Sequence, residues 1–267
     1  MIKAIFFDID GTLVSFKTHQ IPQSTLDAVH RVRQEGVKVF IATGRPIPFV
    51  NNLGKLEYDG IMSVSGGSCV TREGEVICRD TIEQEDLQRL IDYHKEHPMP
   101  IAFASDDDIF ITEMNKTTEE VYKLLDIKNY GQIRSVEACL DMEVMQIIAF
   151  FRQEEESYIM KHILPHCDAY RWHPAFIDAV RKGVSKATGV DLMLKHYGIR
   201  LDEALVFGDG GNDIAMLDHV PHSVAMGNAS DEVKRHARYV TDTVDNDGIA
   251  KFLEGIHTLQ TNQLTIT

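Results

Sequence analysis

A short apolar run that ends in two carboxylates and a glycine constrains the fold of this chain more than any other stretch. Residues 2–7 are almost entirely apolar, which is typical of a strand buried on both faces of a parallel sheet. Asp8 and Asp10 follow, and they would share one side of the strand if it continued through them, because alternate residues point the same way. Gly11 then allows the chain to turn.

The two carboxylates need a partner. Open α/β sheets bind ligands at the carboxyl ends of their strands, which is where Asp8 and Asp10 would lie. Like charges at such a site repel each other unless a cation or a proton lies between them. The stretch therefore predicts a metal, a shared proton, or both. The alternative is an Asp-Gly turn with a solvated acidic tip.

Strands and helices alternate at both ends of the chain, but not in the middle. Apolar runs at Val37–Ala42 and Leu205–Phe207 predict further buried strands, each next to a segment with helical periodicity. This alternation predicts an α/β fold with a Rossmann-like, doubly wound parallel sheet formed by residues 1–81 and 185–267. Residues 82–184 contain helices and short paired strands, which predict an inserted α+β unit with its helices on one face of an antiparallel sheet.

The second predicted strand also ends in polar residues. Thr43-Gly44-Arg45 follows it, and the Thr43 hydroxyl with nearby backbone N–H groups could hold an anion such as phosphate. The alternative is that Thr43 only caps a helix that begins near Pro46. Lys186 begins a predicted helix after the inserted unit. It would either neutralise phosphate charge beside the carboxylates or be an ordinary surface lysine.

A second acidic turn, Gly-Asp-Gly-Gly-Asn-Asp, follows a buried strand in the last third of the chain. Mg²⁺ takes oxygen ligands and keeps several waters, so Asp8, Asp209 and a backbone carbonyl near Asp10 would suffice as protein ligands. Asn212 and Asp213 would bind directly or orient those ligands. The alternative is an acidic turn without a metal.

Composition limits the other functions that this chain could have. The 41 acidic and 27 basic residues give a formal net charge of −14, which disfavours nucleic acid or an anionic membrane as a partner. The four cysteines form no Cys-x-x-Cys pair, so we expect reduced thiols in a cytoplasmic protein without a zinc site or disulfide framework. No apolar run approaches the ~18 residues of a membrane span, and we expect no secretion signal.

Taken together, these motifs resemble the haloacid-dehalogenase-like (HAD) superfamily over the whole chain. The resemblance is carried by Asp8-Ile9-Asp10-Gly11-Thr12, Thr43-Gly44-Arg45, Lys186 and Gly208-Asp209-Gly210-Gly211-Asn212-Asp213. The large insertion and the Gly-Val-Ser-Lys approach to Lys186 are similar to the Cof-type branch with a class IIB cap. The resemblance implies a movable α/β cap over the core and Mg²⁺-dependent hydrolysis of phosphate monoesters, often sugar phosphates.

The resemblance also implies roles for individual residues. Asp8 would be the nucleophile that forms an aspartyl-phosphate, and Asp10 would be the general acid and base. The residues that hold the phosphoryl group would be Thr43, Gly44, Arg45 and Lys186. The Mg²⁺ site would consist of Asp8, the backbone carbonyl of Asp10 and Asp209, supported by Asn212 and Asp213.

The substrate is expected to be a small phosphorylated metabolite of the hexose phosphate class, and the protein is expected to be a monomer or homodimer. Arg171 and Trp172 in the inserted unit are candidates for substrate specificity, because arginine pairs with phosphate or hydroxyls and an indole stacks on a sugar face. A sugar phosphomutase would use the same chemistry. A phospho-accepting receiver-type domain is a third interpretation, but it explains neither the inserted unit nor the second acidic turn.

Overall fold

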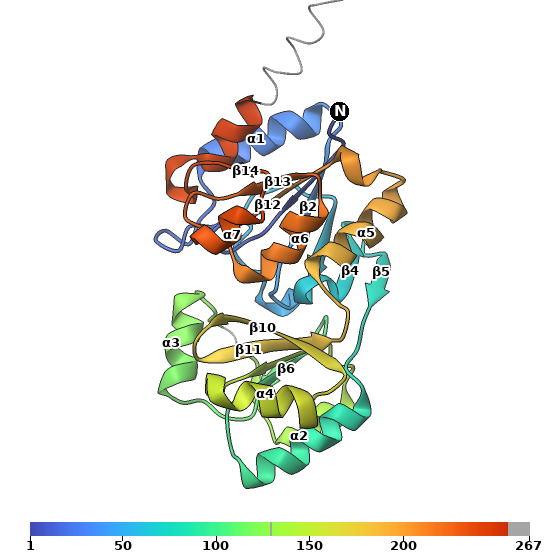
Figure 1. Ribbon diagram of the computed structural model, residues 1–267, viewed down its shortest axis with the longest axis vertical. Helices are drawn as coiled ribbons and strands as arrows, with labels where there is room; N and C mark the ends of the chain where they lie inside the picture. The colour runs from blue at the N-terminus through green and yellow to red at the C-terminus, as the bar shows by residue number, and fades with distance from the viewer. Residues whose placement is uncertain (129, 256–267) are drawn as a thin grey trace, which may run out of the picture.

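The computed structural model describes residues 1–128 and 130–255 of the chain. Its strands form an eight-stranded sheet and a six-stranded sheet, which lie one above the other in Figure 1. The chain begins in the larger sheet, passes through the smaller one and returns to the larger one. None of the helices in the described ranges has the length and apolar character needed to cross a lipid bilayer.

The larger sheet confirms the predicted Rossmann-like α/β core. In spatial order its strands are β14 (Tyr239–Val240), β13 (His222–Ala225), β12 (Ala204–Gly208), β1 (Ala4–Phe7), β2 (Lys38–Ala42), β3 (Gly60–Ser63), β4 (Ser68–Thr71) and β5 (Val76–Arg79). The strands from β14 to β3 are parallel, and the hairpin of β4 and β5 is joined antiparallel to the edge at β3. The sheet is therefore parallel except at one edge.

Helices bury both faces of this sheet, which explains why β1 is apolar throughout. Ile5 and Phe7 pack in a cluster with α1 (Gln23–Gln34) and with a helix that begins at residue 248. Phe6 points to the other face, toward α5 (Lys186–Tyr197). That second face is also covered by α6 (Ile214–His219) and α7 (Asp231–Arg235). A strand without an exposed face has no place for alternating polar residues.

The smaller sheet is formed entirely by the inserted segment. In spatial order its strands are β10 (Cys167–His173), β11 (Phe176–Arg181), β9 (Gln146–Ala149), β6 (Ile101–Ala104), β7 (Ile109–Ile111) and β8 (Gln132–Ile133). All pairs are antiparallel except β7 with β8. The proposed boundaries at 81/82 and 184/185 fall in the connections to this segment and stay predictions.

The prediction that the helices of the inserted segment share one face was wrong. Ile147 of β9 packs with α2 (Gln84–Glu96) and α4 (Gln153–His162), whereas its neighbour Ile148 packs with α3 (Lys116–Leu124). Successive strand residues point to opposite faces, so α3 lies on the opposite face from α2 and α4. The α3 cluster also includes Phe49 of the core. The segment therefore uses α3 to contact the core.

A second difference is that the helix expected near Pro46 is a single 3₁₀ turn. Only η1 forms there, and the backbone turns extended again at Val50. The 3₁₀ turns are η1 (Ile47–Phe49), η2 (Val64–Gly66), η3 (Val136–Asp141), η4 (Leu201–Glu203), η5 (Gly211–Asp213) and η6 (Val244–Asn246).

A buried carboxylate joins α2 to the start of β10. Asp86 has no exposed surface and accepts hydrogen bonds from the backbone N–H and Nδ1 of His166, at 3.0 and 2.9 Å, and from Arg89 at 2.6 Å. We expect Asp86→Ala to lower the free energy of unfolding by about 2 kcal/mol, because it removes the buried acceptor that His166 and Arg89 share. The urea unfolding midpoint measures this loss. Asp92→Ala, which removes an exposed ion pair with Lys95, should leave the midpoint almost unchanged. Equal effects of the two variants would contradict the assignment.

Candidate active site

The carboxyl ends of the parallel strands face the inserted sheet across a cleft of about 650 Å³. This volume lies within the range of roughly 300–1,000 Å³ that is usual for small-molecule sites. Side chains from both sheets line the cleft. The core contributes Asp8, Asp10, Thr43, Arg45, Phe49, Asp209 and Asn212, and the inserted segment contributes Val121, Tyr122, Leu125, Gln146, Ile148, Arg171, Phe176 and Asp178.

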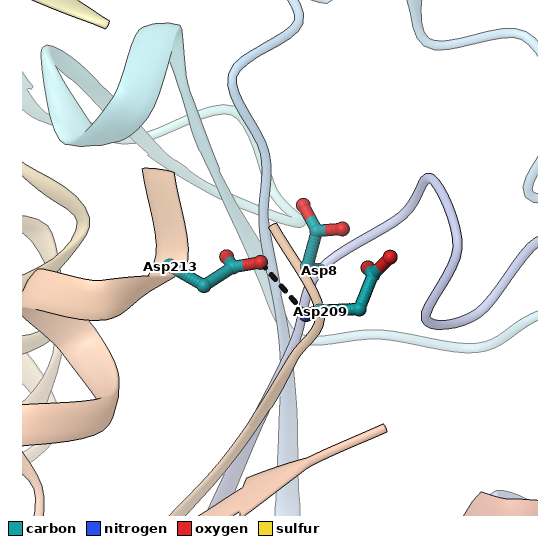
Figure 2. Close-up of side chains that lie close together, drawn as sticks. All are labelled: Asp8, Asp209 and Asp213. Carbon is teal, nitrogen blue, oxygen red and sulfur yellow. Dashed lines mark hydrogen bonds between the residues drawn. The ribbon is translucent and has the colours of Figure 1, made fainter. Parts of the chain in front are cut away.

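Three carboxylates lie close together (Figure 2), and two of them, Asp8 and Asp209, line the cleft. Asp8 follows β1 and Asp209 follows β12, and the parallel register of Phe7 with Phe207 brings the two strand ends together. Asp213 lies at the end of η5, and one carboxylate oxygen from each of the three residues lies within 4.8 Å of the others. Asp8 is 5% exposed, so it does not form the solvated acidic tip considered as an alternative.

Two glycines make this close approach possible. A Cβ at Gly208 would lie 2.6 Å from the Cβ of Asp213, so any larger residue would displace that side chain. Gly11 has a φ of +85° and passes so close to Asp209 that a Cβ would lie 2.1 Å from the carboxylate. Only glycine combines this conformation with this lack of bulk.

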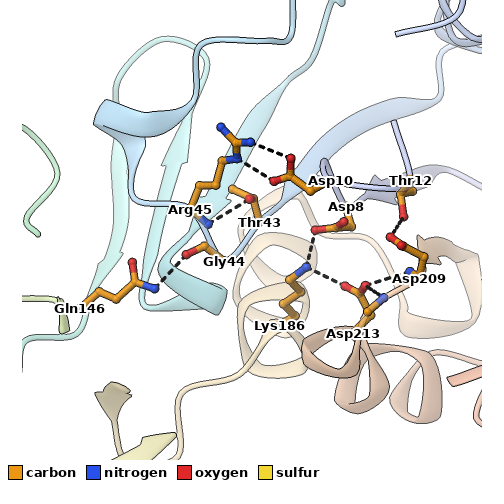
Figure 3. A network of polar contacts seen from close by, with 11 residues as sticks. Asp8, Asp10, Thr12, Thr43, Gly44, Arg45, Gln146, Lys186, Asp209 and Asp213 are labelled. Carbon is orange, nitrogen blue, oxygen red and sulfur yellow. Dashed lines mark hydrogen bonds and ion pairs between the residues drawn. The ribbon is translucent and has the colours of Figure 1, made fainter. Parts of the chain in front are cut away.

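Lys186 lies between two of the carboxylates (Figure 3). Its Nζ donates to Oδ1 of Asp8 and to Oδ1 of Asp213, each at 2.6 Å, and the side chain is fully buried. Lys186 is the first residue of α5, whose start is fixed by a capping box of Ser185 and Thr188. Burial excludes the alternative of an ordinary surface lysine.

The cluster keeps an excess of negative charge. Burial raises the pKa of Asp8, against the opposing effect of Lys186. Burial and the neighbouring Asp213 raise the pKa of Asp209 to about 7. Burial alone would lower the pKa of Lys186, but the charges of Asp213 and Asp8 outweigh it and raise the pKa above its usual value. One ammonium group therefore faces three carboxylates, which favours a further cation or a proton at this site.

The donor set fits a divalent cation such as Mg²⁺, because all three side chains offer oxygen. Asp213 is the least available of the three: Oδ1 accepts from Lys186, and Oδ2 accepts from the backbone N–H groups of Asp209 and Gly210 at 2.9 and 2.8 Å. Asp213 therefore orients the turn and the lysine. Asp8 and Asp209 are the better candidates for direct ligands.

Asp10 lies two residues from Asp8 but its side chain does not join the cluster. Its two carboxylate oxygens accept from Nε and Nη2 of Arg45, at 2.6 and 2.7 Å (Figure 3). The carboxylate still lines the cleft. The structure thus gives the two aspartates different surroundings, with a lysine beside one and an arginine beside the other.

Thr43 and Gly44 form another part of the cleft wall. Thr43 Oγ1 accepts from the backbone N–H of Arg45 at 3.0 Å, and the first turn after it is capped at Pro46, so Thr43 is not a helix cap. The carbonyl of Gly44 accepts from Nε2 of Gln146 at 3.0 Å, which joins the core to the inserted sheet. A Cβ at Gly44 would lie 3.2 Å from Nδ2 of Asn212, which places that amide beside Gly44.

Sequence reasoning missed Gln146 and Asp178, which face the cleft from neighbouring strands β9 and β11. Each is the polar residue of an otherwise apolar run, and this exception was the available signal. Of the predicted specificity residues, Arg171 lines the cleft and its Nε donates to Glu156 at 2.5 Å. The side chain of Trp172 lies outside the described part of the structure.

Comparisons with known proteins agree over most of the chain. Residues 5–253 match a family model described as haloacid dehalogenase-like hydrolase. "Putative phosphatase YkrA" of Bacillus subtilis (strain 168) is 33% identical over 256 residues, which cover 93% of this chain and 95% of YkrA. A "Putative phosphatase" of Haemophilus influenzae is 28% identical over 95% of this chain and 98% of its own length.

Comparison with solved structures indicates the same family. The HAD subclass IIB sugar phosphatase BT4131 superposes with a TM-score of 0.89 at 40% identity, over 96% of this chain and 99% of its own. BT1666 from Bacteroides thetaiotaomicron, described among the phosphatases of the haloalkanoate (HAD) enzyme superfamily, has a TM-score of 0.87 at 36% identity, over 96% and 95% of the two chains. With the family model, these similarities show that the chain belongs to the haloacid dehalogenase-like hydrolases, in their Cof-type branch.

Proposed function

We propose that this hydrolase is a Mg²⁺-dependent phosphatase that acts on phosphate monoesters of small metabolites, with hexose phosphates as the substrate class. The observation that carries the proposal is the contact of buried Lys186 with Asp8, inside a group of three carboxylates of which two line the cleft. The names of its relatives, which are phosphatases and in one case a sugar phosphatase, support the same function. A cytoplasmic location and a monomeric or homodimeric state belong to the proposal as well.

The reaction would begin at Asp8. Because Lys186 holds Oδ1 of Asp8, we assign the attack on phosphorus to Oδ2. A bond forms between Oδ2 and phosphorus while the bond from phosphorus to the alcohol oxygen breaks, and Asp10 gives that oxygen a proton. Water then attacks the phosphorus of the aspartyl-phosphate and passes its proton to Asp10. This second step releases inorganic phosphate and restores Asp8.

The positive groups offset charge during both steps. Lys186 lies on the nucleophile, where it favours the ionised form of Asp8 and stabilises negative charge on the phosphoryl oxygens. When bound, Mg²⁺ would supply further positive charge, held by Asp8 and Asp209 with the Asp10 carbonyl, while Asp213 orients the site. Thr43 and the backbone of Gly44 line the same part of the cleft and would contact the phosphoryl group.

The cleft also supports a sugar as the leaving group. Part of the cleft wall combines apolar side chains with polar groups. A sugar presents the same combination, with apolar C–H faces and polar hydroxyls. The apolar residues are Phe49, Tyr122, Ile148 and Phe176, and the polar ones are Gln146, Asp178 and Arg171. Within the described chain, Oε1 of Gln146 and Nη2 of Arg171 are buried without a hydrogen-bond partner, which leaves both atoms for substrate hydroxyls.

The proposal predicts that Asp8→Asn abolishes turnover. With Mg²⁺ present, the purified protein should release inorganic phosphate from hexose phosphates, and the variant should lose more than about 10³-fold in kcat, because the amide cannot act as the nucleophile. Asp202→Asn, which alters an exposed ion pair with Arg200, is the matched control and should keep full activity. Phosphorus NMR distinguishes hydrolysis from a mutase, which would instead give an isomeric sugar phosphate. Equal activity of Asp8→Asn and wild type would rule out this mechanism.

Cation binding should stabilise the folded protein. Ligand at about 100 times its Kd adds about 2.7 kcal/mol of stability, so Mg²⁺ should raise Tm by about 5 °C and chelation should reverse the rise. Asp209→Asn should reduce this Mg²⁺-dependent shift, since it removes an anionic ligand beside Asp8. Asp202→Asn, which alters an exposed ion pair with Arg200, serves as control. A thermal midpoint that is the same in Mg²⁺ and in chelator would argue against the site.

A further inference from the structure

The guanidinium of Arg45 is buried at the junction of the core, Asp10 and the inserted segment (Figure 3). Nε and Nη2 donate to the two oxygens of Asp10 at 2.6 and 2.7 Å. Nη1 donates to the carbonyl of Phe49 at 2.9 Å, and Nη2 also donates to the carbonyl of Leu125 at 2.9 Å. Arg45 is only 7% exposed, so these acceptors replace water around most of its donors.

These contacts fix the orientation of the guanidinium. Arginine presents its donors in a rigid plane, so a side chain bound at Nε, Nη1 and Nη2 cannot rotate without losing several hydrogen bonds. Phe49 belongs to the 3₁₀ turn of the core, whereas Leu125 is the residue that ends α3 in the inserted segment. The arginine is therefore anchored from both sides of the cleft. Its orientation is complete only when the segment carrying α3 is seated on the core.

The orientation of Asp10 depends on this anchor. Asp8 and Asp10 leave the same strand end, yet the carboxylate of Asp10 is outside the group formed by Asp8, Asp209 and Asp213. Arg45 binds both of its oxygens and holds it apart from the acidic cluster.

We propose that Arg45 is a positioning residue, which holds Asp10 toward the leaving-group side of the cleft and makes that position dependent on the contact with Leu125. This inference rests on the proposed phosphatase function. It differs from the role expected from the sequence, in which Arg45 holds the substrate phosphate. The two roles make opposite predictions for substrates whose leaving group needs no proton.

The test compares two phosphate esters. Glucose 6-phosphate has an alcohol leaving group that needs a proton from Asp10, whereas 4-nitrophenolate leaves as a stable anion. General acid catalysis contributes about 10²–10⁴-fold. We expect Arg45→Ala to lower kcat about 100-fold with glucose 6-phosphate and less than about tenfold with 4-nitrophenyl phosphate. Inhibition by inorganic phosphate should be unchanged, because the donors of Arg45 are engaged by Asp10 and by the carbonyls of Phe49 and Leu125.

Further variants keep the test decisive. Arg45→Lys retains the positive charge but not the planar arrangement of donors, so it should show the same selective loss of activity. It also serves as the test variant if Arg45→Ala does not fold. Asp10→Asn should show the same selectivity, and adding Arg45→Ala to it should cost little more, because both changes remove one function. Arg134→Ala breaks an ion pair with Asp108 in the inserted segment and should affect neither substrate.

The outcomes separate the hypotheses. Equal losses with both esters, or a weaker inhibition by phosphate in Arg45→Ala, would overturn the positioning role in favour of a structural or phosphate-binding one. If the wild-type protein hydrolysed neither ester, the proposed phosphatase function itself would fail. The inference would be supported if the Arg45 variants lost activity with glucose 6-phosphate but not with 4-nitrophenyl phosphate. The double variant with Asp10→Asn should then be little worse than Asp10→Asn alone.

Discussion

The structure depends on one electrostatic constraint, which is that three carboxylates converge where two parallel strands end. Asp8 and Asp209 meet because β1 and β12 pair in parallel register, and Asp213 folds back beneath them at Gly208. Such a group is unstable without positive charge, and Lys186 supplies it from the first turn of α5. The cap of that helix, the two close-packed glycines and the register of the sheet all serve to hold this arrangement.

The inserted segment adds what the core lacks, which is a second wall. A strand end open to solvent would leave water beside any reactive intermediate, and a wall over it excludes water and strengthens the local electrostatics. Two hydrogen bonds between the two parts end on backbone carbonyls: Gln146 donates to Gly44, and Arg45 donates to Leu125. These contacts join the wall to the residues that follow β2, so the cleft and the core are completed together.

Much of this arrangement could be predicted from the sequence, for a local reason. Asp8 and Asp209 each follow an apolar run that ends abruptly, and fold rules bring such strand ends to one edge of the sheet. Lys186 by itself left two interpretations open, and its place beside the carboxylates was implied by the family resemblance. Gln146 and Asp178 lack such a signal, because one polar residue in an apolar strand does not reveal which face it occupies. The face of the sheet that α3 covers was mispredicted because it depends on a contact with Phe49, which is distant in the chain.

The surroundings of Asp8 and Asp10 explain how identical residues at one strand end can act differently. Lys186 is a compact charge that contacts one oxygen of Asp8 and is shared with Asp213, so the other oxygen of Asp8 is not held by the lysine. Arg45 is a planar group that contacts both oxygens of Asp10 and so fixes the plane of the carboxylate. A nucleophile needs an available oxygen, whereas an acid and base needs a fixed direction. In the proposed mechanism, in which Asp8 would be the nucleophile and Asp10 the acid and base, lysine beside one and arginine beside the other would meet these two requirements.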